Sequence, residues 1–210
     1  MKFSDIKCKK DRQKMNLYND PITVSHQWLS EVISEGMITV DATAGNGYDT
    51  VFLAAKVGDK GKVYAFDIQE AAINATEQRL LKAGLANRVN LIHAGHENLK
   101  SFVVSPINAM IFNLGYLPGS NKNIVTQAKT TLEALQAGMD LLLPEGLIVL
   151  TVYIGHPGGY EEWLELEKYL KSLSKNLWNV IMLKFLNRHS KTPFNIFIQR
   201  IDQGQGGVGI

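Results

Sequence analysis

The sequence contains a single cysteine, Cys8, among 210 residues. One cysteine cannot form an intramolecular disulfide, and it excludes a metal site built from several thiolates. No apolar run approaches the roughly 18–20 residues that cross a bilayer, and residues 1–14 lack the apolar stretch of a signal peptide. These absences predict a cytoplasmic protein that has no membrane partner.

Charged residues are present in ordinary number, but they are placed unevenly. Residues 1–14 hold six lysines and arginines against two aspartates, so this arm carries +4 while the other 196 residues sum to −2. The arm either adds contacts to RNA phosphates or is a solvated end that aids solubility. The length and the 45% hydrophobic share suit one domain, residues 15–201, between the basic arm and a glycine-rich tail at 202–210.

Apolar strands alternate with amphipathic helices along the chain. We expect strands at residues 37–42, 63–68, 89–94, 107–113, 147–153, 180–186 and 194–200, and helices at 23–35, 48–57, 70–83, 122–143 and 158–174. The last two strands have no helix between them, so the final one should run antiparallel to its neighbour. The expected fold is α/β and Rossmann-like: a mostly parallel seven-stranded sheet with helices on both faces and an antiparallel C-terminal hairpin.

A glycine-rich loop follows the first expected strand. It holds Gly45 and Gly47 between Asp41 and Asp49, and it precedes a helix. Glycine lets the backbone approach a ligand closely, and a helix N-terminus offers N–H donors. Asp67 ends the second strand, 22 residues after Gly45, where a carboxylate can accept hydrogen bonds from both hydroxyls of an adenosine ribose. We therefore expect a cofactor that contains adenosine.

Two such cofactors fit the loop, S-adenosyl-L-methionine (SAM) and a nicotinamide dinucleotide. The dinucleotide fingerprint needs a small residue three positions after Gly47, where Thr50 stands. Carboxylates repel a diphosphate, but Asp41 and Asp49 suit the sulfonium and the ammonium group of SAM. We expect SAM, with S-adenosyl-L-homocysteine (SAH) as the product. The alternative that these aspartates only cap helices stays open.

Further cofactor contacts are expected at neighbouring positions. Ile68 would pack on the adenine ring or belong to the core, and His96 and Glu97 would contact the adenine or begin a helix. The candidate cofactor-binding residues are Asp41, Thr43, Gly45, Asn46, Gly47, Asp49, Thr50, Asp67, Ile68, His96, Glu97 and Asn113.

Asn113 ends the fourth strand, and Tyr116 follows three residues later. The carboxyl end of this strand should face the group that the cofactor transfers. The Asn-x-x-Tyr spacing resembles the Asn/Asp-Pro-Pro-Tyr motif of amino-group methyltransferases, although Leu114 and Gly115 replace the two prolines. That resemblance implies that Asn113 accepts hydrogen bonds from the target amine and that Tyr116 stacks on the substrate. Otherwise Asn113 and Gly115 only form a tight turn.

Methyl transfer to an amine needs positioning and a nitrogen lone pair, but no metal ion. An alkylammonium substrate must first lose a proton. His156 and Glu161, just after the fifth strand, are candidates to accept it, although His156 could equally be an exposed loop residue. The candidate catalytic residues are Asn113, Tyr116 and His156. Other histidines and tyrosines are interpreted as structural: His26, His93, His189, Tyr153 and Tyr160.

Residues 15–200 are similar to a bacterial rRNA methylase family now associated with tRNA wobble uridines, as 5-aminomethyl-(2-thio)uridine methyltransferases. The strongest stretches are residues 41–50, 112–119, 153–159 and 192–194, with Ser-Asn-Lys at 120–122 close to a Gly-Asp/Asn-Lys run of the family. Thr192 departs from the usual Pro-Pro-Phe.

The resemblance implies a class I methyltransferase fold and transfer of one methyl group from SAM to the primary amine of the modified uridine in tRNA. Methylation of rRNA or of a small-molecule amine is the alternative within this chemistry. A non-catalytic cofactor-binding module or an NAD-dependent oxidoreductase is the alternative of another class. The sequence leaves the oligomeric state open, a homodimer included.

Overall fold

The computed structural model describes residues 20–117 and 125–202. The basic arm at 1–14, the tail beyond residue 202 and the Ser-Asn-Lys run at 120–122 lie outside the described residues. Within the described part of the chain, no helix has the length and apolar character that crossing a membrane requires.

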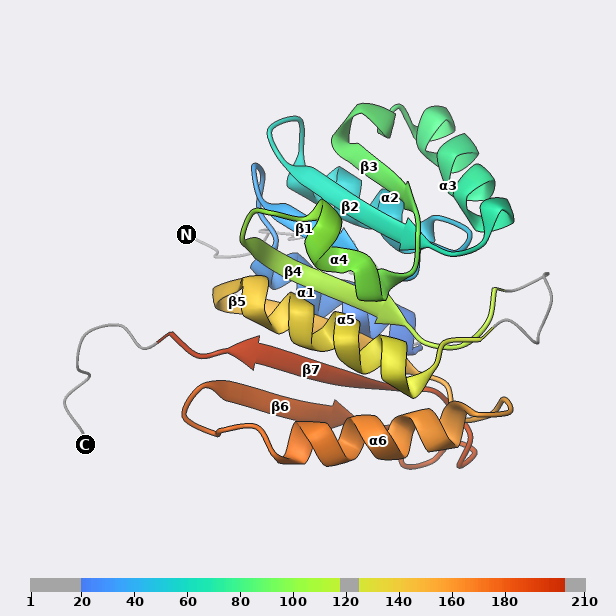
Figure 1. Cartoon of the computed structure of the whole chain (residues 1–210), viewed down its shortest axis with the longest axis vertical. Helices are drawn as coiled ribbons and strands as arrows, with labels where there is room; N and C mark the ends of the chain where they lie inside the picture. Colours follow the sequence, from blue (N-terminus) through green and yellow to red (C-terminus); the bar gives the residue numbers. More distant parts are fainter. Residues whose placement is uncertain (1–19, 118–124, 203–210) are drawn as a thin grey trace, which may run out of the picture.

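The sheet has seven strands in the order β3-β2-β1-β4-β5-β7-β6 (Figure 1). The strands are β1 (Ile38–Asp41), β2 (Lys62–Asp67), β3 (Val89–His93), β4 (Ile107–Asn113), β5 (Leu142–Val152), β6 (Trp178–Leu183) and β7 (Phe194–Arg200). β1 to β5 pair in parallel, whereas β7 pairs antiparallel with both β5 and β6. The predicted parallel sheet with an antiparallel C-terminal hairpin is confirmed. The strand order reverses between β1 and β4, which is where open α/β sheets bind ligands.

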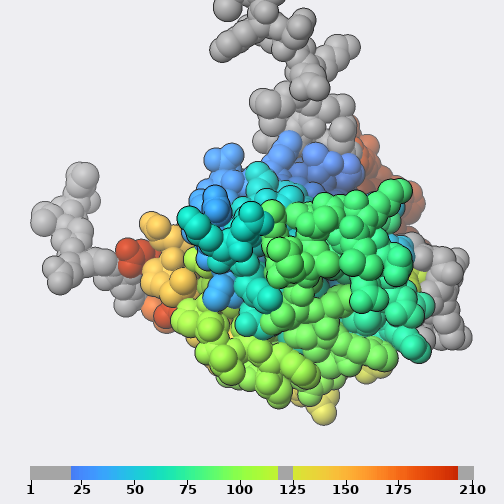
Figure 2. Space-filling view, turned by 90° about the horizontal axis from the view of Figure 1, so that it is seen from above, coloured from blue at the N-terminus to red at the C-terminus, as the bar shows by residue number. Residues whose placement is uncertain are grey.

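Helices cover both faces of this sheet. They are α1 (Pro21–Val32), α2 (Tyr48–Val57), α3 (Glu70–Ala83), α4 (Leu99–Phe102), α5 (Ala128–Leu141) and α6 (Gly159–Lys171), with short 3₁₀ turns η1 (Ala86–Arg88) and η2 (His96–Asn98). The first three pack over one apolar core, which contains Leu29, Leu53 and Leu80, and the last three over the other, which contains Leu99, Leu135 and Leu166. Seen from the β3 end of the sheet, the surface is formed mainly by the teal to light-green segment that contains α3, β3 and α4 (Figure 2).

Local chemistry explains where several helices begin and end. The Asp20 side chain accepts a hydrogen bond from the Thr23 N–H at 2.9 Å, and proline at the first helical position suits the start of α1. α3 ends at Gly84, whose φ of 69° lies in the left-handed region that glycine adopts readily. Both bounds of α2 and α3 agree with the prediction.

The segment around residue 143 differs from the prediction. The helix expected at 122–143 spans Ala128–Leu141, and Pro144 and Glu145 lie inside β5 rather than in a turn before it. β4 pairs Ile107 with Leu142 but Ala109 with Leu147, so β5 carries extra residues that form a bulge, with Glu145 at φ 64°. The apolar residues 141–143 suit a helix or a strand equally, and pairing with β4 decides between the two.

Candidate functional site

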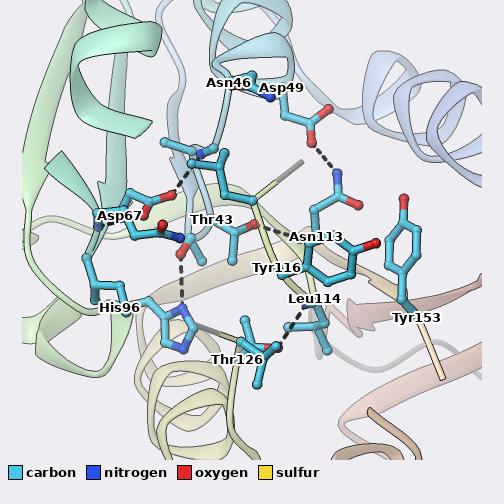
Figure 3. A pocket seen from close by; sticks show the side chains of 18 of the residues that line it. Thr43, Asn46, Asp49, Asp67, His96, Asn113, Leu114, Tyr116, Thr126 and Tyr153 are labelled. Carbon is cyan, nitrogen blue, oxygen red and sulfur yellow. Dashed lines mark hydrogen bonds between the residues drawn. The ribbon is translucent and has the colours of Figure 1, made fainter. Parts of the chain in front are cut away.

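A cavity of about 1000 Å³ lies at the carboxyl ends of the parallel strands. Its walls are the loops that follow β1, β2, β3, β4 and β5, together with the start of α1. Figure 3 shows Asp67 and His96 on one side of it and Asn113, Tyr116 and Tyr153 on the other. The predicted site residues that line it are Thr43, Gly45, Asn46, Asp49, Asp67, Ile68, His96, Glu97, Asn113, Tyr116 and His156.

Three predicted cofactor contacts, Asp41, Gly47 and Thr50, are not in the lining. Asp41 is fully buried beneath the loop. Its Oδ2 accepts a hydrogen bond from the Thr50 hydroxyl at 2.6 Å, and its Oδ1 accepts one from the Thr43 N–H at 3.1 Å. Burial, reinforced by the negative charge of Asp49, raises the pKa of Asp41 to about 7. Asp41 and Thr50 therefore shape the loop rather than face the cavity.

Gly47 precedes the first residue of α2 and packs closely against α3, and only glycine suits this position. Its φ is 80°, and a Cβ added there would stand 2.9 Å from the Cα of Thr76. α3 also braces the loop, because the Thr76 hydroxyl donates to the Gly45 carbonyl at 3.0 Å and Arg79 Nε donates to the Asn46 carbonyl at 2.7 Å. Thr76 and Arg79 were missed by the sequence reasoning, since they look like ordinary positions of a surface helix.

The Asp67 carboxylate is held in a fixed orientation at the end of β2. One oxygen accepts a hydrogen bond from the Gly45 N–H and the other from the Gln69 N–H, both at 2.9 Å. The neighbouring Ile68 is 56% exposed and lines the cavity, so core packing is excluded for it. A carboxylate beside an exposed aliphatic side chain can bind a ribose and the face of a base together.

His96 begins η2, as one of its two interpretations predicted, and it also lines the cavity, so the adenine contact stays a prediction. Burial lowers the pKa of His96, which keeps the ring neutral. Its Nδ1 lies 3.0 Å from the Ala42 carbonyl and donates to it. The Nε2 atom is therefore a buried acceptor, and it has no hydrogen-bond partner among the described residues.

Asn113 is fixed at both its backbone and its side chain. Its N–H donates to the Thr43 hydroxyl at 2.7 Å, and its Nδ2 donates to Asp49 Oδ2 at 2.6 Å (Figure 3). The Oδ1 atom is buried without a hydrogen-bond partner in the described part of the chain. These contacts involve more than a tight turn. The backbone N–H of Asn113 bonds to the loop after β1, and its side-chain amide bonds to the first turn of α2.

His26 is a cavity residue that the sequence reasoning set aside as structural. It comes from α1, and its Nε2 lies 2.6 Å from Asp49 Oδ1. Its ring stacks on Phe52, with ring centroids 3.8 Å apart and planes within 2° of parallel. Nothing local in the sequence identifies it, since residues 26, 49 and 113 meet only when α1, α2 and β4 pack together.

Tyr116 and His156 stand at the far side of the cavity from Asp67. The Tyr116 ring is 39% exposed and meets His156 edge-on, with centroids 6.1 Å apart. His156 Nδ1 lies 2.9 Å from the Pro157 carbonyl, a contact in which the ring donates, and its Nε2 is buried without a hydrogen-bond partner among the described residues. Tyr153 also lines the cavity, and burial raises the pKa of its phenol to about 12, which keeps it protonated.

Glu161 and Glu162 have opposite environments. Glu161 is exposed on α6 and outside the cavity lining, so it is not placed to accept a substrate proton. Glu162 is 3% exposed and accepts hydrogen bonds from the hydroxyls of Thr126, at 2.8 Å, and Thr131, at 2.6 Å. Because Thr126 in turn accepts from the Gly115 N–H, Glu162 anchors the loop that follows β4. Glu162 precedes the buried Leu166 by four residues, and this helical spacing could have shown that Glu162 lies on the buried face of α6.

Clusters of three or more His, Cys, Asp or Glu side chains that could hold a metal ion are absent from the residues that the structure describes.

The family and one curated relative that the chain matches are both described as RNA methyltransferases. Residues 63–199 match the family described as "Putative rRNA methylase". A chloroplastic tRNA (mnm(5)s(2)U34)-methyltransferase from Arabidopsis thaliana is 42% identical over 177 residues, which cover 79% of this chain and 64% of that protein. The chain thus spans somewhat less than two thirds of this curated relative's length.

Two solved structures resemble the chain over most of its length. One is a Clostridium thermocellum protein described as a "putative rRNA-methylase", with a TM-score of 0.85 and 38% identity, covering 87% of this chain and 98% of that one. The other is a Streptococcus mutans methyltransferase in complex with SAH, with a TM-score of 0.79 and 37% identity, covering 86% and 98%. The family match spans well over half of the chain, and the fold is that of the Rossmann-like methyltransferases. The chain therefore belongs to the rRNA methylase family.

Proposed function

We propose that this protein is a SAM-dependent N-methyltransferase that acts on the aminomethyl group of 5-aminomethyl-(2-thio)uridine at the wobble position of tRNA. The observation that carries the proposal is the 42% identity to the Arabidopsis wobble-uridine methyltransferase. The site supports it, because the Asn113 amide, typical of enzymes that methylate amines, lies at the cavity beside Tyr116. The cytoplasm is the location that we propose for the reaction.

The charges of the cavity favour SAM over a dinucleotide. Four carboxylate residues line it, namely Asp20, Asp49, Asp67 and Glu97, and no lysine or arginine is among its described lining residues. Such a wall attracts a sulfonium and an ammonium group and repels a diphosphate. A Streptococcus mutans relative of the same fold was solved in complex with SAH, which agrees with this preference.

Each end of the cavity suits one part of SAM. Asp67 would accept hydrogen bonds from the ribose hydroxyls, and Ile68 would cover one face of the adenine. The unpartnered Nε2 of His96 is an acceptor on the same side. When bound, SAM supplies a methyl group that a nitrogen lone pair can accept, so the chain has chiefly to position the amine.

The residues after β4 and β5 would handle the substrate. Asn113 Oδ1 would accept a hydrogen bond from the amine and so direct its lone pair. The exposed ring of Tyr116 would stack on the uridine, a type of contact that contributes about 1–3 kcal/mol per base. His156 Nε2 is the candidate acceptor for the proton that an ammonium substrate must lose.

The decisive experiment uses tRNA and rRNA from a strain that lacks the gene. Purified protein and SAM are added, and the nucleosides are analysed by mass spectrometry. We expect 5-aminomethyl-(2-thio)uridine in tRNA to gain one methyl group, with no change in rRNA and with much slower methylation by the Asn113→Ala variant. Methylation confined to rRNA would support the alternative that the family description suggests, and the absence of methylation from both would refute the proposal.

A further inference from the structure

We infer that Asp49 and His26 are positioning residues that decide which end of the Asn113 amide meets the substrate. The inference rests on the proposed function, because it assigns a purpose to the amide oxygen in methyl transfer to an amine. Neither residue is required by the Asn-x-x-Tyr spacing that singled out Asn113.

The amide group of an asparagine is nearly symmetric in shape. The oxygen and nitrogen ends of an asparagine have nearly the same shape, so only their hydrogen-bond partners decide which end points where. Only the oxygen can accept an N–H from a substrate amine. A rotation of the amide by half a turn would present a second donor to that amine and would misdirect its lone pair.

Asp49 removes this ambiguity. An ionised carboxylate only accepts hydrogen bonds, and its Oδ2 lies 2.6 Å from Asn113 Nδ2. The nitrogen end is therefore committed to Asp49, and Oδ1 points away from it, on the side where Tyr153 lies (Figure 3). The backbone cannot drift to relieve this contact, because the Asn113 N–H is bonded to Thr43 at 2.7 Å.

His26 in turn fixes Asp49. Its Nε2 engages the other carboxylate oxygen, Oδ1, at 2.6 Å, and the stacked ring of Phe52 holds the imidazole plane. Asp49 is only 6% exposed, so little water competes for its oxygens. Each carboxylate oxygen of Asp49 thus has one hydrogen-bond partner. The hydrogen-bonded chain His26–Asp49–Asn113 runs from α1 to the carboxyl end of β4.

The competing explanation is that Asp49 binds the cationic cofactor directly. The two roles predict different losses. A cofactor ligand lowers SAM affinity when its charge is removed, whereas a positioning residue lowers kcat and leaves that affinity nearly unchanged. An exchange of the two side chains separates the roles, because it keeps the net charge of the site and reverses the direction of the hydrogen bond.

The experiment compares Asp49→Asn, Asn113→Asp and the double variant with Glu165→Gln, an exposed α6 control. We expect each single variant to lose about 10²-fold in kcat, with SAM affinity of Asp49→Asn within about threefold of wild type. The double variant should recover at least tenfold over either single one, because residue 49 then donates and residue 113 again presents an oxygen. His26→Gln should lose less. The inference would be overturned if the loss of methylation activity in Asp49→Asn came entirely from weaker SAM binding and the double variant recovered no kcat.

Thermal unfolding of the wild type, the two single variants and the double variant tests the coupling between residues 49 and 113 without any assay of activity. Asn113→Asp brings two carboxylates together and should lower the Tm, and Asp49→Asn should restore it in the double variant. Additive Tm changes would contradict the proposed contact. Coupled unfolding in a protein that methylates no tRNA would instead refute the proposed function and leave the Asp49–Asn113 contact standing.

Discussion

Two parts of the described chain differ sharply in charge. The first, acidic part is the described chain up to residue 167, which contains 17 acidic residues and eight lysines and arginines. The second, basic part is residues 168–201, which contain seven lysines and arginines and no Asp or Glu. The acidic part supplies all the carboxylates of the cavity lining. Under the proposed function, the acidic part would attract the cationic cofactor and the basic part would attract a polyanion such as RNA.

Three of the basic residues, Lys184, Arg188 and Lys191, belong to the connection between β6 and β7. This connection lies at the carboxyl-terminal end of the parallel strands (Figure 1), which is the end whose loops line the cavity. A Cβ added to Gly155, in the loop that carries His156, would stand 3.8 Å from Lys191. Leu186, at 99% exposure, adds an exposed apolar side chain to this connection. If the proposed function holds, residues 184–191 are the surface through which the basic part would reach a substrate at the cavity.

The largest effect is expected at Asn113, which lies in the acidic part at the end of β4. Asn113→Ala should lower the single-turnover methylation rate by about 10²-fold or more, because a displacement of the reacting nitrogen of about 1 Å can have that effect. SAM affinity should stay within about twofold. Single-turnover assays on tRNA that bears 5-aminomethyluridine, beside cofactor titration, measure both. A wild-type rate would reduce the motif to a turn.

Asp67→Ala tests the acidic part alone. The variant would remove the two proposed ribose hydrogen bonds and the observed one from the Gly45 N–H, so SAM affinity should fall by an amount on the order of 2–3 kcal/mol, or roughly 30- to 150-fold. Binding of tRNA should not change. Calorimetry gives the first quantity and a filter-binding assay the second. Unaltered SAM affinity would remove Asp67 from the cofactor site.

The basic part is tested by the triple variant Lys184→Gln, Arg188→Gln and Lys191→Gln. If these groups bind phosphates, tRNA affinity should fall about tenfold, and the slope of log K against log salt should flatten by roughly 0.7–0.9 for each phosphate that is no longer neutralised. SAM affinity should be unchanged. The control neutralises Lys56, Lys60 and Lys82, three lysines of the acidic part. Equal effects of the two triple variants would show that only net charge matters.

The smallest effect concerns Asp41, buried in the acidic part. Its pKa is raised from the ordinary 3.8 to about 7, so the folded protein keeps a proton that the unfolded chain releases. Stability from this group is therefore present at low pH and is lost as the pH rises from about 4 through 7. Between pH 5 and 8 the Tm of wild type should fall a few degrees further than that of Asp41→Asn. Parallel curves would contradict the raised pKa.

Prediction from the sequence succeeded where the signal is local. The bounds of α2, α3, β4 and β7 agree with the expected residues, because glycine punctuation and apolar periodicity mark them directly. Prediction was less accurate around residues 141–146, because the leucines there suit a helix and a strand equally well. It also missed Thr76, Arg79 and Glu162, whose contacts are made with residues 31 to 36 positions away along the chain.

The sequence by itself determined the type of fold, the loop between Asp41 and Thr50 and the candidate reacting end at Asn113, since each of these depends on neighbours within a few residues. Only the tertiary structure decided that Asp41 lies beneath the loop while Asp49 faces the cavity. It alone placed His26 against Asp49, and Asp49 against Asn113. The physical reason is that hydrogen bonds between side chains depend on distances set by the packing of α1, α2 and β4, which no local pattern of residues encodes.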